Sequence, residues 1–168
     1  MNNKLLSIAH YAVPFTTGLF LLPLSHFAGA VTNVTVKVTV IAPLSCEING
    51  NKPITVDFGN AVETGKVNGT NYLKEVNYDI NCKNNTTNAL KMKISGQTAS
   101  FDSKAVKTNN ANLGIALYNG NTRIVINEGF NFTWPNKPVL KAVPVKNTSA
   151  TLKSGGFSGA ATMTVDYQ

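Results

Sequence analysis

Cys46 and Cys82 are the residues whose type and spacing bear most directly on chemistry. A redox-active pair normally has the spacing Cys-x-x-Cys, and this chain has no such motif. The chain starts with a predicted export signal, described below, and exported proteins fold in oxidising compartments where cysteines form structural disulfides. We therefore predict a disulfide between Cys46 and Cys82. In the chain-entropy model, a closed loop of this length stabilises the folded state by about 4 kcal/mol.

Histidine is absent from most of the chain, because His10 and His26 both lie within the first 30 residues. Removal of a signal there leaves no histidine, which excludes Ser-His-Asp and Cys-His triads and zinc sites with histidine ligands. The eight Asp and Glu residues leave a hydrolase with paired carboxylates open, but none of them stands in a recognisable catalytic setting. We predict that the chain is not an enzyme and holds neither a cofactor nor a metal.

Trp134 lies next to Pro135 and close in sequence to Phe130 and Phe132. Such a cluster could be a platform on which a sugar stacks, although aromatic clusters more often belong to a core or its edge. The cluster therefore keeps a carbohydrate-binding module open as an alternative function.

Residues 1–30 have the composition of a secretory signal. Lys4 supplies the charged start, residues 18–22 lie in the apolar stretch, and Ala28-Gly29-Ala30 offers small residues for cleavage. A membrane anchor is disfavoured, because prolines interrupt an apolar run that is already shorter than the roughly 20 residues needed to span a bilayer. We expect export, with a mature chain that starts at Val31 and is not inserted in a membrane.

The mature chain is mildly basic. The full sequence has 15 Lys and Arg against 8 Asp and Glu, and loss of Lys4 with the signal leaves a net charge of +6. The lysines are scattered along the sequence without a basic block or interleaved aromatic residues. This pattern indicates a solvated surface and no binding of nucleic acid.

The elements that must position these residues begin with an alternating stretch at residues 31–40. Four valines alternate there with polar residues, which is the period-two pattern of a strand with one buried face. Pro43 follows at once and has no N–H to donate, so we expect no tight hairpin partner. An unpaired apolar strand favours aggregation unless another chain pairs with it. The alternating side chains are those of Val34, Val36, Val38 and Val40.

Short apolar runs separated by Asn- and Gly-rich turns follow along residues 43–168. The runs begin at Ser45, Ile54, Tyr72, Leu90, Leu113 and Val139, with a polar stretch at residues 95–112. Pro144 places the end of its run at a sheet edge or bulge. No stretch has a sustained helical period, so the pattern predicts an all-β sandwich in one domain.

The last stretch, residues 159–168, alternates again and runs to the end of the sequence. Alternation alone allows two interpretations, a final strand paired on both sides or one with an open edge.

These features together resemble the subunits of chaperone-usher pili. The resemblance rests on the order of the signal, the N-terminal alternating strand, the two cysteines and the C-terminal strand with its penultimate Tyr167. The stretches at residues 56–59 and 114–118 add to it, as does Gly155, which falls where the family has a glycine near its C-terminus. Among pilins, the chain looks most like the minor or adaptor subunits of P-pilus-type tip fibres.

The resemblance implies an incomplete immunoglobulin-like sandwich that lacks its last strand. It implies a signal peptide at residues 1–30, a donor-strand extension at 31–42 and a pilin domain at 43–168. A periplasmic chaperone would first lend the missing strand to the domain. The N-terminal extension of the next subunit would replace it at an outer-membrane usher, and the product is an adhesive fimbrium on the cell surface. For an adaptor, the neighbouring subunits would include the tip adhesin.

The resemblance also assigns residues to these steps. The donated side chains are Val34, Val36, Val38 and Val40, and the C-terminal strand that the chaperone contacts includes Gly155, Ala161, Met163, Val165 and Tyr167. Many subunits have a glycine among the donor positions, where this chain has Val38. That difference points to a specific neighbour rather than to a repeating major subunit. The alternative is a secreted, complete immunoglobulin-like module that binds a carbohydrate near Trp134.

Overall fold

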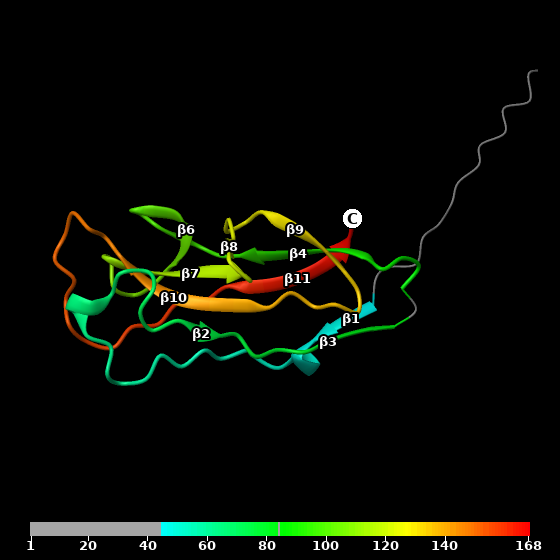
Figure 1. The fold of residues 1–168 in the computed structure, drawn as a ribbon, viewed down its shortest axis with the longest axis horizontal. Coiled ribbons are helices and arrows are strands. Elements are labelled where there is room, and N and C mark those ends of the chain that lie inside the picture. Colours follow the sequence, from blue (N-terminus) through cyan, green and yellow to red (C-terminus); the bar gives the residue numbers. More distant parts are fainter. Residues whose placement is uncertain (1–44, 84) are drawn as a thin grey trace, which may run out of the picture. The chain divides into compact units, whose positions relative to one another are not determined.

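The computed structural model describes residues 45–83 and 85–168 (Figure 1). The regular elements of this part of the chain are strands and two short 3₁₀ helices, η1 at Asn49–Asn51 and η2 at Thr64–Lys66. The strands are β1 (Ser45–Ile48), β2 (Lys74–Glu75), β3 (Ile80–Lys83), β4 (Ala89–Ser95), β5 (Thr98–Ala99), β6 (Asp102–Lys107), β7 (Leu113–Asn119), β8 (Thr122–Arg123), β9 (Gly129–Thr133), β10 (Leu140–Lys146) and β11 (Thr162–Tyr167). The prediction of an all-β fold is confirmed.

The strands form three antiparallel groups. The largest has the order β2-β10-β7-β6-β5, with β8 paired to β7; the second has the order β11-β4-β9, and β1 pairs with β3. In Figure 1, β11 (red) runs beside β4 toward the C-terminus.

Alternating side chains explain why these segments form strands with one buried face. In β4, Leu90, Met92 and Ile94 are buried, whereas Lys91 and Lys93 are exposed. In the segment before and into β3, Val76, Tyr78 and Ile80 alternate with polar residues and are also buried. These side chains belong to one core cluster with Phe132 and Leu140.

Tyr78 brings a polar group into this core. Its hydroxyl donates a hydrogen bond to the carbonyl oxygen of Pro138, at 2.6 Å. Burial disfavours the charged phenolate and raises the pKa of Tyr78 to about 12. The phenol is therefore a neutral donor over the whole physiological pH range.

The stretch at residues 95–112 looked polar in the sequence but contains β5 and β6. Its inward-facing residues are small, among them Ala99 and Ala105, so the hydrophobic alternation is weak. Gly114 of β7 lies against them, and a Cβ added there would be 3.0 Å from the Cβ of Ala105. Small residues of β5, β6 and β7 therefore pack closely here, where other strands bury large apolar side chains.

Pro144 lies at a sheet edge, as predicted. In β10 it is opposite Ile115 of β7, but β2 on the other side pairs only with Lys141 and Ala142. Proline has no N–H to donate, and on that side no described strand lies opposite Pro144 that would need one.

None of the helices in residues 45–83 and 85–168 could span a membrane.

Candidate functional site

A groove of about 730 Å³ lies between residues 46–58 and the segment that leads into and includes β11. Its floor consists of core side chains from the larger sheet and from β4. The apolar residues that line this floor are Val76, Ile94, Val106, Ile115, Leu117, Leu140 and Ala142. Ile115 and Leu117 are only half-buried, so the core is incompletely covered along the groove.

Strand β11 forms one wall of the groove. Met163, Val165 and Tyr167 are half-buried and pack against the core, whereas Thr162, Thr164 and Asp166 are exposed. Its only strand partner among the described residues is β4. Of the two interpretations of the last strand, the structure therefore supports the open edge.

The free edge of β11 offers backbone groups for pairing. The N–H of Gln168 donates to the carbonyl oxygen of Ala89, at 3.2 Å, in the ladder between β11 and β4. Since successive residues of a strand point their N–H and C=O groups to opposite sides, those of Met163 and Val165 point away from β4. This edge can accept another strand.

Residues 53–58 form the opposite wall; in sequence order they are the first wall of the groove, and β11 is the second. Ile54, Val56 and Phe58 are half-buried and alternate with exposed residues, as in a strand. The sequence predicted a strand from Ile54 to Phe58, but this segment pairs with no strand in the part of the chain that the structure describes. The pattern of a strand is present and its pairing partner is missing.

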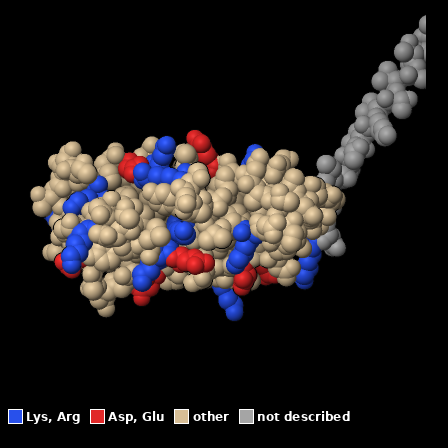
Figure 2. All heavy atoms as spheres, in the orientation of Figure 1, with Lys and Arg blue, Asp and Glu red and all other residues tan. Residues whose placement is uncertain are grey.

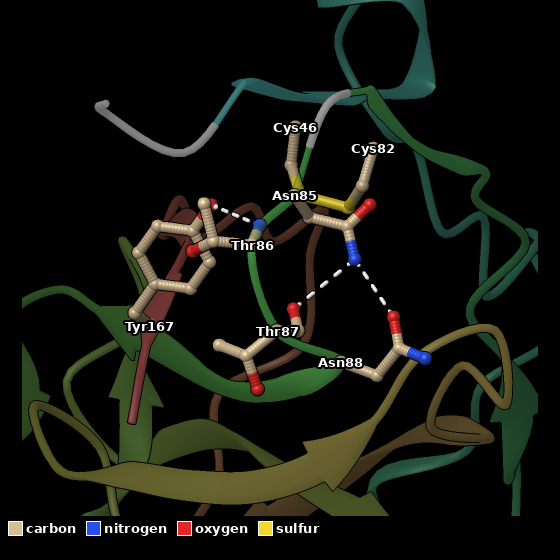
Figure 3. The surroundings of a disulfide bond; sticks show 7 residues. All are labelled: Cys46, Cys82, Asn85, Thr86, Thr87, Asn88 and Tyr167. Carbon is tan, nitrogen blue, oxygen red and sulfur yellow. Dashed lines mark hydrogen bonds between the residues drawn. A yellow bond between two sulfur atoms is a disulfide. The ribbon is translucent and has the colours of Figure 1, made fainter. Parts of the chain in front are cut away.

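The predicted disulfide is present at one end of the groove. Cys46 in β1 lies directly opposite Cys82 in β3, and the two are bonded (Figure 3). Cys46 also lines the groove. The bond thus fixes β1, which precedes the wall at residues 53–58, to β3.

Tyr167 connects β11 to the loop that follows Cys82. Its hydroxyl accepts a hydrogen bond from the N–H of Thr86, at 3.1 Å (Figure 3). The side chain of Asn85 holds the same loop through the carbonyl oxygen of Thr87, at 3.1 Å, and Oδ1 of Asn88, at 2.7 Å. The penultimate tyrosine therefore anchors the C-terminal end of the groove wall.

Two other predicted site residues lie before β11. Ala161 is exposed and immediately precedes the strand, which is shorter than the predicted residues 159–168. Gly155 has a φ of +129°, which favours glycine, and lines a second cavity of about 450 Å³ that shares Val56 and Phe58 with the groove. The donor residues Val34, Val36, Val38 and Val40 lie outside the described residues.

The remaining candidate chemistry is not supported by the geometry. Phe132 is buried, and Phe130 and Trp134 pack against the core, so this cluster is a core edge. No group of metal-binding side chains occurs in residues 45–83 and 85–168. On the face in Figure 2, basic and acidic residues are interspersed and form no large patch of one sign.

The groove wall formed by β11 could be predicted from the sequence, whereas the apolar floor of the groove could not. Ile115 and Leu117 belong to a predicted strand, and only the tertiary arrangement shows that they face an open groove. The alternation from Ile54 to Phe58 predicted a strand there, but not that the segment lines a groove.

Two sequence comparisons match most of this chain to known proteins. The model of the fimbrial protein family matches residues 33–168. The fimbrial-like protein YfcR of Escherichia coli K12 is 38% identical over 151 residues, which cover 86% of each chain. The family model and YfcR each match this chain over most of its length.

Two solved structures are similar to the described fold. The P pilus adaptor subunit PapF is 29% identical, with a TM-score of 0.53 over 77% of this chain and 98% of its own. The P pilus rod subunit PapA has a TM-score of 0.62 over 76% of this chain and 100% of its own; at 20% identity it supports the immunoglobulin-like fold alone. The chain belongs to the fimbrial protein family and is a structural, non-enzymatic subunit of a chaperone-usher pilus.

Proposed function

We propose that this chain is a minor or adaptor subunit of an adhesive surface pilus and assembles by donor-strand complementation and exchange. The observation that carries the proposal is the apolar groove beside the free edge of β11. An extended segment of another chain would add as a strand there, with backbone hydrogen bonds for affinity and alternate side chains for specificity.

Residues 31–42 have the pattern that such a groove requires. Four alternating valines would present one apolar face to the core of a neighbouring subunit. Full burial stabilises by about 1.5 to 3 kcal/mol for each valine, so the set contributes on the order of 6 to 12 kcal/mol as an upper bound. Slow release of such a strand would hold the fibre together kinetically.

The same groove makes the free subunit prone to aggregation, because it combines half-buried apolar residues such as Ile115 and Leu117 with an edge that no described strand pairs. A periplasmic chaperone that lends a strand would cover both until exchange at the outer-membrane usher. Met163, Val165 and Tyr167 would lie beside the lent strand, with Ala161 and Gly155 at its far end. This route requires export, which the signal at residues 1–30 would provide.

A minor or adaptor position is supported by Val38, which stands where many subunits have a glycine at the donor strand. Its larger side chain needs a neighbouring groove with room at that point. This favours one specific partner, such as an adhesin, over self-association into a long rod.

The substitution Val36→Asp tests the proposal, with Thr35→Asp as its matched control one position away. We expect Val36→Asp to lower the amount of chain in sheared surface fibres by at least about tenfold, because burying an unpaired carboxylate costs several kcal/mol. Thr35→Asp places the same charge on the exposed face and should leave assembly within about twofold. Equal effects of the two substitutions would contradict the proposal.

A further inference from the structure

The turn that leads into the first groove wall has an unusual backbone. Asn49, Gly50 and Asn51 form η1, and all three have positive φ values, of 50°, 59° and 58°. This left-handed conformation is strained for most residues and is tolerated by glycine and, to a smaller degree, by asparagine. The Asn-Gly-Asn sequence therefore suits a turn that redirects the chain from β1 to residues 53–58.

The side chain of Asn49 holds the start of this wall. Its Nδ2 group donates to the carbonyl oxygens of Lys52, at 3.0 Å, and Pro53, at 3.2 Å. The backbone N–H of Asn49 donates to the carbonyl oxygen of Asp79, at 2.8 Å. Asn49 thus connects the wall to the segment that leads into β3.

Along its length the wall is held by apolar packing: Ile54, Val56 and Phe58 lie against the core, and the ring of Phe58 lies 5.8 Å from that of Phe157. At its far end, the N–H of Gly59 donates to Oδ1 of Asp57, at 2.7 Å. Between these two ends, residues 53–58 pair with no strand in the described part of the chain. Apolar packing holds the wall against the core, and the hydrogen bonds of Asn49 fix where it begins.

We propose that Asn49 is a positioning residue for strand capture. Its amide keeps the first wall in place while the groove is empty, so that an incoming extended, apolar peptide segment meets a preformed site. This inference rests on the proposed function and assigns a role in it to a residue that the groove-filling strand does not need to touch.

The role predicts an effect on the rate of capture. Without the amide, the wall is correctly placed for only part of the time, and the capture rate falls by that fraction. In the filled groove, the added strand pairs with the wall and takes over the constraint. The rate of release should therefore change little.

The test follows capture of a synthetic peptide of residues 31–42 by the mature chain, residues 31–168. The chain is refolded by dilution from denaturant into excess peptide, and fluorescence of Trp134, the single tryptophan, reports folding. For the wild type we expect a step whose rate is proportional to peptide concentration. Release is measured separately, by chasing labelled peptide with unlabelled peptide.

Two variants distinguish the effect of the Asn49 amide from that of the turn conformation. Asn49→Gly keeps a residue that readily adopts positive φ, and Asn49→Asp replaces the donor with a carboxylate of nearly the same shape. Both should slow capture by about tenfold, as expected for the loss of two hydrogen bonds. Both should leave release within about twofold of the wild type.

Asn68→Asp is the matched control, at another Asn-Gly sequence. The oxygen Oδ1 of Asn68 only accepts, from the N–H groups of Thr70, at 3.0 Å, and Asn71, at 2.8 Å, and aspartate keeps this function. Capture by this variant should match the wild type.

The outcomes distinguish the inference from the proposed function. A wild-type chain without a peptide-dependent step overturns both. Normal capture by Asn49→Gly and Asn49→Asp overturns the inference alone. It is also overturned if both variants release the peptide faster by the same factor by which they capture it more slowly, because that is general destabilisation.

Discussion

Residues 43–168 alone should aggregate or melt at low temperature, whereas the same residues followed by a flexible linker and residues 31–42 should form a soluble, stable monomer. The added strand would fill the groove over the floor residues and pair with the free edge of β11. Four buried valines contribute on the order of 6 to 12 kcal/mol as an upper bound. A third of this amount would raise the Tm by about 10 °C in a domain of this size. Thermal unfolding and sedimentation measure both properties.

The matched control carries the same linker and strand with threonine in place of Val34, Val36, Val38 and Val40. Threonine keeps the shape and the strand propensity of valine but adds a hydroxyl that the apolar groove cannot satisfy. This control should lose most of the stabilisation that the appended valine strand provides. A stable, cooperative monomer of residues 43–168 without any added strand would mean that the sandwich is already complete, and would favour the carbohydrate-binding module.

Loss of the disulfide should have the second largest effect. The double substitution Cys46→Ser and Cys82→Ser, made in the chain with the appended strand, should lower the free energy of unfolding by about 4 kcal/mol. The bond closes a loop between residues 36 positions apart and fixes β1, at the end of the groove, to β3. Chemical denaturation measures the change.

Reduction of the unsubstituted chain is the control for this prediction. A reductant should reproduce the loss of stability in the unsubstituted chain and should have no effect on the double variant. A denaturation midpoint that neither the substitutions nor the reductant shifts would contradict a stabilising role of the disulfide.

Much of the fold could be predicted because its strands have strong local patterns. Leu90, Met92 and Ile94 alternate with lysines, and Val76 and Tyr78 occupy one face of their segment. The cysteine pairing followed from the expected compartment and from there being only two cysteines. Local alternation and composition were sufficient for these features.

The polar strands and the groove could not be predicted in the same way. Ala99 and Ala105 are inward-facing but too small to produce a visible hydrophobic period. The groove joins residues near 54 to residues near 163, and whether β11 has a partner on its second side is a property of the tertiary structure. The alternation from Ile54 to Phe58 correctly indicated strand-like burial, but not that this segment pairs with no strand among residues 45–83 and 85–168.

The central claim is that residues 31–40 of one subunit fill the groove of another, and site-specific photo-cross-linking in assembled fibres tests it most directly. A photoreactive side chain is placed at each position from 34 to 39 in turn, and cross-linked residues are identified by mass spectrometry. Positions 34, 36 and 38 should cross-link to groove residues of a neighbouring subunit, such as Val56, Ile115 and Met163, whereas positions 35, 37 and 39 should not. Cross-links without this alternation, or only within the same chain, would contradict it.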